Sequence, residues 1–182
     1  MNSFKKQIPN ILTTFRLILV PVFWWAFWNP GMVFQGRLFA FAVCFTAGMT
    51  DLLDGYLARK FEAISSYGKL IDPLADKLMT ISVMICFMIT GDIPTLLVAV
   101  FLAKDLILVL GSAVLLKDKD IVVFSDIFGK LATVVLALGL ALTFFDLTPY
   151  NMYLLYAALV IALIAFVRYS TFAVKTLFFS KK

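Results

Sequence analysis

The chain has 182 residues, of which 63% are hydrophobic and 15% are charged, and its net charge is +5. Its mean hydropathy of +1.00 excludes an ordinary soluble domain and indicates a protein embedded in a membrane. The sequence contains no histidine, which excludes nucleophilic or general-base chemistry that depends on imidazole. At about 20 residues for each span, the length allows about six spans and short loops. We therefore expect one membrane domain over residues 1–182.

Apolar runs separated by turn-forming residues predict an all-α, polytopic integral membrane protein with about six transmembrane helices. In chain order, the predicted spans are Ile11–Trp28, Leu38–Leu57, Ile71–Thr90, Pro94–Leu116, Gly129–Phe145 and Tyr150–Phe172. The turn signals between spans are Asn29-Pro30-Gly31, Gly91-Asp92-Ile93-Pro94 and Thr148-Pro149. The first run ends in bulky aromatic residues and has no small-residue cleavage site, so we expect a retained span and not a signal peptide.

The distribution of basic residues predicts the orientation of these spans. With a cytoplasmic N-terminus, the external loops hold Arg37 alone. The cytoplasmic side then holds Lys5, Lys6, Arg59, Lys60, Lys69, Lys117, Lys119, Lys175, Lys181 and Lys182. This arrangement follows the positive-inside rule, so we expect a multi-pass cell-membrane protein with both termini in the cytoplasm. The positive charge then reflects topology and anionic lipid, and we expect no nucleic-acid partner.

Four aspartates lie near the junction of the second and third predicted spans. With four further residues they follow the pattern D-x2-D-G-x2-A-R-x8-G-x3-D-x3-D, formed by Asp51, Asp54, Gly55, Ala58, Arg59, Gly68, Asp72 and Asp76. Helical residues three or four apart share a face, so each aspartate pair lies on one side of its helix. Ionisable groups at a membrane edge are costly and usually functional. Oxygen ligands without histidine or cysteine suit Mg²⁺ or Mn²⁺. At the cytoplasmic end of these spans, the four aspartates are accessible to soluble substrates.

This pattern resembles the signature of the CDP-alcohol phosphotransferases, also called CDP-alcohol phosphatidyltransferases. These integral membrane enzymes transfer a substituted phosphate from a CDP-alcohol to a second alcohol. The resemblance implies two divalent metal ions, Mg²⁺ or Mn²⁺, bound by Asp51, Asp54, Asp72 and Asp76. It also implies that Asp76 is the catalytic general base and that the protein is a homodimer.

The resemblance further implies a binding site for the CDP moiety formed by Asp54, Gly55, Ala58, Arg59 and Gly68. The small residues would let the nucleotide approach the backbone, and the guanidinium offers planar donors to phosphate. Simpler interpretations stay open for single residues. Asp72 is also suited to cap a helix. Gly55 and Gly68 are also suited to close helix packing. Arg59 and Lys60 are also suited to anchor the chain at the cytoplasmic surface.

The segments Ile8–Thr13, followed by Arg16, and Asp72–Lys77 resemble phosphatidylglycerophosphate synthases. Those enzymes join CDP-diacylglycerol to glycerol 3-phosphate and release CMP, which is the reaction we expect. The chain departs from them at Lys104-Asp105, where they carry Arg-Glu. CDP-alcohol-type cardiolipin synthases, whose acceptor is phosphatidylglycerol, carry an Arg-Asp pair there together with a Thr-Asp-Leu-Leu-Asp-Gly stretch. This chain has that stretch at Thr50–Gly55. Both acceptors stay open.

Three cationic residues are candidates for binding the acceptor: Lys104, Lys130 and Arg168. Pairing of Lys104 with Asp105 or with a neighbouring helix is an equal alternative. Lys130 and Arg168 are equally suited to reach lipid headgroups. Ser125 and Asp126 are typical of a helix cap.

A divalent-cation transporter is the alternative from another functional class, because intramembrane carboxylates also line ion pathways. A transporter would need polar groups continuing across the bilayer. The second and third spans are almost wholly apolar beyond the aspartates. The pattern therefore favours an enzyme.

Overall fold

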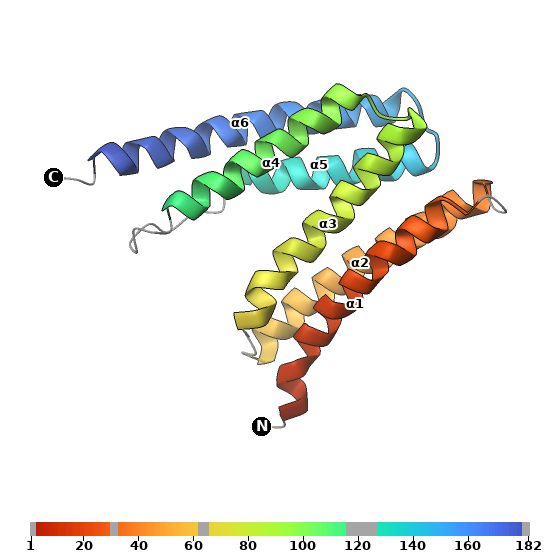
Figure 1. Ribbon diagram of the computed structural model, residues 1–182, viewed down its shortest axis with the longest axis horizontal. Coiled ribbons are helices and arrows are strands. Elements are labelled where there is room, and N and C mark those ends of the chain that lie inside the picture. The colour runs from red at the N-terminus through yellow and green to blue at the C-terminus, as the bar shows by residue number, and fades with distance from the viewer. Residues whose placement is uncertain (1–2, 30–32, 62–65, 116–126, 180–182) are drawn as a thin grey trace. The chain divides into compact units, whose positions relative to one another are not determined.

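The computed structural model describes the backbone of residues 3–29, 33–61, 66–115 and 127–179, and the side chains of 14–29, 36–51, 75, 77–108 and 127–171. Within these residues all regular secondary structure is helical, which confirms the predicted all-α class. The helices drawn in Figure 1 are α1 (Ser3–Phe27), α2 (Val33–Phe61), α3 (Ser66–Thr90), α4 (Thr95–Leu115), α5 (Ile127–Phe144) and α6 (Tyr150–Phe179). The predicted cap residues Ser125 and Asp126 lie outside the described residues.

The helices extend beyond the apolar runs at their polar ends. α1 begins at Ser3 and not at Ile11, and α3 begins at Ser66 and not at Ile71. Hydropathy detects lipid-facing side chains, whereas the helical hydrogen bonds of the backbone continue into polar segments. The predicted third span, Ile71–Thr90, puts Pro73 in a first helical turn, where proline is tolerated. That prediction is wrong, because Pro73 is inside α3. Its ring nitrogen cannot donate a helical hydrogen bond to the carbonyl of Lys69, four residues earlier.

Residues up to Cys86 form the first of two compact units, in which α1 packs along α2. The buried face of α1 consists of Arg16, Leu19, Phe23 and Ala26, and that of α2 includes Ala40, Val43 and Ala47. Small side chains on α2 let the two backbones approach closely. Near one end of the pair, the rings of Trp25 and Phe39 meet edge to face, with centroids 6.4 Å apart.

The part of α3 in the first unit has one buried face, which includes Ala75, Met79, Val83 and Cys86. The Sγ atom of Cys44 on α2 lies 3.8 Å from the Sδ atom of Met79. These residues recur at helical spacing, so one side of α3 faces protein from Ala75 to Cys86.

Residues from Phe87 onward form the second unit, in which α5 packs along α6 and α4 also contacts α6. α5 and α6 pack closely at Gly139, where an added Cβ would be 2.9 Å from Cδ2 of Leu155. The rings of Phe87 and Phe144 pack edge to face at 4.7 Å. Near the same end of α5, buried Asn151 donates from Nδ2 to Oγ1 of Thr143 at 3.3 Å.

Two of the predicted turns separate helices as expected. α3 ends before Gly91, whose φ of +83° is the left-handed conformation that favours glycine after a helix. Between α5 and α6, Asp146 has a φ of 53° and the Thr148-Pro149 peptide bond is cis. The second of these connections allows α6 to fold back along α5.

Two helical segments within the described residues are long and apolar enough to cross a membrane, namely Ile127–Phe144 and Tyr150–Thr171. Thr14–Phe27 and Lys77–Thr90 are shorter apolar helical segments. The composition and these segments together indicate a membrane protein.

Candidate active site

The aspartate pattern lies on two consecutive helices of the first unit. Its first five residues occupy the last three turns of α2, which ends at Phe61, and its last three lie in the first half of α3, which begins at Ser66. On α2, Asp51 follows the buried positions Val43 and Ala47 at helical spacing. On α3, the register positions of the last two aspartates precede the buried Ala75 and Met79 by three residues each. Asp51 therefore continues the protein-facing side of α2.

Arg16 on α1 reaches the first aspartate of this pattern. Arg16 lies one turn before Leu19 on the buried face of α1, and Asp51 lies one turn after Ala47 on α2. Contacts at both ends show that the two helices run antiparallel, since Trp25 meets Phe39 and the earlier Arg16 meets the later Asp51. The helix packing thus brings together two charges 35 residues apart in the sequence.

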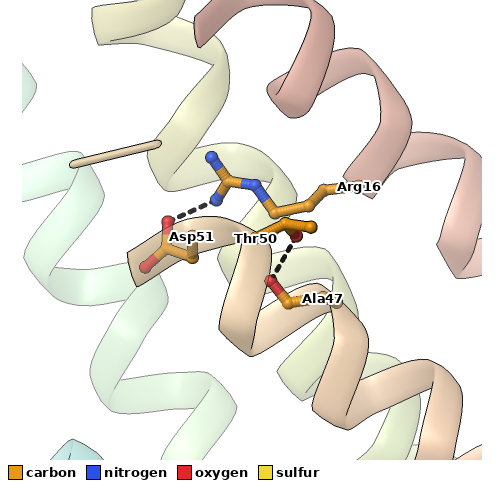
Figure 2. A network of polar contacts seen from close by, with 4 residues as sticks. All are labelled: Arg16, Ala47, Thr50 and Asp51. Atoms are coloured by element: carbon orange, nitrogen blue, oxygen red, sulfur yellow. Dashed lines mark hydrogen bonds and ion pairs between the residues drawn. The ribbon is translucent and has the colours of Figure 1, made fainter. Parts of the chain in front are cut away.

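Figure 2 shows the resulting ion pair, in which Nη1 of Arg16 donates to Oδ1 of Asp51 at 2.5 Å. The Arg16 side chain is 4% exposed and the Asp51 side chain is 47% exposed. A buried guanidinium is costly unless a carboxylate compensates it. In the same turn of α2, Thr50 Oγ1 donates to the carbonyl oxygen of Ala47 at 2.8 Å. The carboxylate is therefore held from one side by a fixed, buried cation.

The remaining pattern residues have helical backbones, and their side chains lie outside the described residues: Asp54, Gly55, Ala58, Arg59, Gly68, Asp72 and Asp76. Among the side chains that the structure does describe, no group of three or more histidine, cysteine, aspartate or glutamate residues forms a metal cluster. The assigned roles of these seven residues stay predictions.

The chemistry of the donor set fits a hard divalent cation. The chain has no histidine, and the pattern supplies carboxylate oxygens, which Mg²⁺ and Mn²⁺ prefer. Asp51 meets this requirement in the structure, since its partly exposed carboxylate can accept from Arg16 and bind a cation at the same time.

The candidate acceptor residues lie in the second unit. Lys104 Nζ donates to Oδ1 of the adjacent Asp105, so these two charges pair with each other in the middle of α4. Lys104 Nζ also lies 5.7 Å from the centroid of the Phe101 ring. This pairing is the structural alternative that the sequence left open for Lys104.

Lys130 and Arg168 lie on α5 and α6, respectively, and both side chains are exposed. The Cζ atom of Arg168 lies 4.7 Å from the centroid of the Phe128 ring, a cation–π contact between the beginning of α5 and the later part of α6. This contact limits where the guanidinium can move. Lys130 is two residues after Phe128 on α5. Binding of an acceptor phosphate by these residues stays a prediction.

Sequence reasoning did not assign a role to Arg16. The signal was present, because Arg16 is the one charged residue within the first predicted span. An isolated charge in an apolar helix needs a partner and is usually functional. The sequence could not show that this partner is Asp51.

Comparison with known proteins decides the family. The family model for CDP-alcohol phosphatidyltransferase matches residues 6–164, which is most of the chain. The chain belongs to this family. The match includes Arg16 and all eight residues of the pattern, so the expected resemblance is confirmed. Membership of this family also makes the protein a transferase.

Several curated relatives bear names within this family. A probable phosphatidylglycerophosphate synthase of Mycobacterium tuberculosis is 36% identical over 138 residues, covering 75% of this chain and 65% of that protein. A CDP-diacylglycerol–glycerol-3-phosphate 3-phosphatidyltransferase of Mycoplasma genitalium is 32% identical over 158 residues, covering 79% of this chain and 66% of that protein. The alignments thus span slightly less than two thirds of these relatives.

A cardiolipin synthase (CMP-forming) of Streptomyces coelicolor is also similar to this chain. It is 38% identical over 109 residues, covering 59% of this chain and 51% of that protein. Both acceptor types considered from the sequence therefore occur among the named relatives.

Proposed function

We propose that this protein transfers the phosphatidyl group of CDP-diacylglycerol to glycerol 3-phosphate, forming phosphatidylglycerophosphate and CMP. The observation that carries this proposal is the complete eight-residue pattern on α2 and α3 of a chain that belongs to the family. The names of the relatives from Mycobacterium tuberculosis and Mycoplasma genitalium support glycerol 3-phosphate as acceptor.

In the proposed reaction, a hydroxyl oxygen of glycerol 3-phosphate attacks the phosphorus that carries the diacylglycerol. A new P–O bond forms, the P–O bond to CMP breaks, and the hydroxyl proton passes to the carboxylate of Asp76. CMP leaves with the electron pair of the broken bond. No oxidant or further reactant is needed.

We assign Asp51, Asp54, Asp72 and Asp76 as ligands of two divalent ions. When bound, Mg²⁺ or Mn²⁺ neutralises the pyrophosphate and the charge that develops on the leaving group. Arg59 donates hydrogen bonds to phosphate. Asp54, Gly55, Ala58 and Gly68 line the site for the CDP moiety.

Lys104, Lys130 and Arg168 are the proposed cations for the acceptor phosphate. Of the three, Lys130 and Arg168 are the stronger candidates, because Lys104 is paired with Asp105. Glycerol 3-phosphate carries a charged phosphate that needs such partners, whereas phosphatidylglycerol would approach from the bilayer and depend on them less.

We further propose that the chain is one domain over residues 1–182 with about six spans, and that both termini and the active site face the cytoplasm. The two long apolar segments in α5 and α6 support the membrane location. We also propose that two copies of the chain form a homodimer.

Transfer to phosphatidylglycerol is the second candidate function, favoured by the similarity to the Streptomyces coelicolor cardiolipin synthase and by Lys104-Asp105. An assay of the purified protein with CDP-diacylglycerol and separate acceptors distinguishes the two. Glycerol 3-phosphate, phosphatidylglycerol, inositol phosphate and serine form the panel, and CMP release with product analysis gives the readout.

A further inference from the structure

We propose that Arg16 is a positioning residue, which holds the carboxylate of Asp51 so that its second oxygen is presented to a divalent cation. This inference rests on the proposed function, since it takes Asp51 as a metal ligand. It adds α1 to the helices that form the site.

The contact geometry supports this role. One nitrogen of Arg16, Nη1, donates to one oxygen of Asp51, Oδ1, at 2.5 Å. An ionised carboxylate accepts at both oxygens, so this contact and metal binding through Oδ2 are compatible.

The unequal burial of the two partners shows which of them is fixed. Arg16 is 4% exposed and lies on the packed face of α1, whereas Asp51 is 47% exposed at its side chain. Here the cation is enclosed and the carboxylate is presented, which is the arrangement of an outer-shell group behind a metal ligand.

Charge gives a second reason for an arginine at this place. Carboxylates that share a site repel one another. The guanidinium offsets part of this repulsion at Asp51 before a cation arrives. Loss of Arg16 should therefore weaken metal binding, and outer-shell substitutions typically do so by about 10- to 100-fold.

The test is Mn²⁺ binding to the purified, detergent-solubilised protein without substrate, with free Mn²⁺ measured by electron paramagnetic resonance. Arg16→Gln is expected to weaken Mn²⁺ binding by about 10- to 100-fold. Arg16→Lys should restore part of the affinity, because lysine keeps a positive charge beside Asp51. Arg37→Gln is the matched control, because it removes an arginine of α2 that lies outside the aspartate pattern. This variant should bind Mn²⁺ like the wild type.

A double-substitution cycle separates positioning from a general effect on folding. If Arg16 acts through Asp51, adding Arg16→Gln to Asp51→Asn changes Mn²⁺ affinity little beyond Asp51→Asn alone, whereas independent effects add. Additive losses, or wild-type Mn²⁺ affinity in a folded Arg16→Gln protein, would overturn the inference. Thermal unfolding and gel filtration establish that each variant is folded.

The acceptor assay of the wild type keeps this inference separate from the proposed function. Weakened Mn²⁺ binding in Arg16→Gln, with no lipid product from any acceptor, supports the inference and overturns the proposed function. Product from glycerol 3-phosphate, with unchanged Mn²⁺ affinity in Arg16→Gln, does the reverse.

Discussion

At the scale of single residues, the ion pair of Arg16 and Asp51 gives the aspartate pattern a cationic neighbour. Asp51 is the pattern's one residue with a described side chain, and it is oriented by a helix that contributes no pattern residue. A carboxylate held in this way loses little freedom when it binds a ligand, which favours binding. The residue-scale account therefore predicts different consequences for different aspartates.

Asp76→Asn should lower kcat by about 10²–10⁴, because it removes the proposed general base as well as a metal ligand. CDP-diacylglycerol binding should weaken more in Asp51→Asn, which lacks a ligand central to the proposed metal cluster. Steady-state kinetics and lipid binding of both variants check these expectations. Near-normal turnover in Asp76→Asn would require another base.

Asp92→Asn is the control for this comparison. Asp92 lies between α3 and α4, outside the pattern, and its Oδ2 accepts from Oγ1 of Thr90 at 2.6 Å. It should keep wild-type kcat, which shows that the loss in Asp76→Asn is not a general effect of removing an acidic group.

Lys130→Ala and Arg168→Ala should raise KM for glycerol 3-phosphate and leave that for CDP-diacylglycerol nearly unchanged, since only the acceptor phosphate loses a cation. Arg168 also contacts the Phe128 ring, so thermal unfolding must accompany its kinetics. Arg37→Ala serves as the arginine control. Equal effects on both substrates would point to a folding defect and against an acceptor site.

The aspartate pattern could be found from the sequence because its residues are local and regularly spaced. The partner of Asp51 could not, since the two charges lie 35 residues apart and meet only because α1 and α2 pack antiparallel. The sequence shows that Arg16 is a charged residue within an apolar run, but it does not show toward which helix the side chain points. The Lys104-Asp105 pair was foreseen as one alternative, because the two residues are adjacent.

At the scale of helices, the contact of α5 with α6 depends on the absence of a side chain at Gly139. A Cβ there would lie 2.9 Å from Leu155 Cδ2 and 3.2 Å from the Leu155 backbone nitrogen. The backbone atom cannot move aside as a flexible side chain can. Small residues at such positions let membrane helices pack closely.

Gly139→Ala should therefore destabilise the protein by about 1–3 kcal/mol, the usual cost of overpacking. Gly129→Ala is a matched control on the same helix, because an added Cβ at Gly129 meets nothing within 4 Å. Thermal unfolding in detergent should show a lower midpoint for Gly139→Ala and an unchanged or higher one for Gly129→Ala. A midpoint at or above that of the wild type for Gly139→Ala would contradict close α5–α6 packing.

The sequence predicted the number and order of helices in the described residues, but not all of their ends. Apolar runs located each helix, and Gly91 and Thr148-Pro149 marked connections. The polar beginning of α3 was missed because hydropathy does not measure backbone hydrogen bonding. As a result, Pro73 was placed at a helix start although it lies inside α3.

At the scale of the whole molecule, the proposed site needs divalent cations to hold four carboxylates together. EDTA should abolish activity, and excess Mg²⁺ or Mn²⁺ should restore it, because the carboxylates otherwise repel one another and the pyrophosphate. CMP release measured before and after metal is added back checks this expectation. Full turnover in metal-free buffer would contradict the two-metal site.

The acceptor assay tests the central claim most directly. Purified protein in Mg²⁺ buffer is given CDP-diacylglycerol with glycerol 3-phosphate or with phosphatidylglycerol, and lipid products are identified by mass spectrometry. We expect phosphatidylglycerophosphate and an equal amount of CMP from glycerol 3-phosphate. No product from glycerol 3-phosphate, with cardiolipin formed from phosphatidylglycerol, would contradict the proposed function and assign the chain to the cardiolipin synthases.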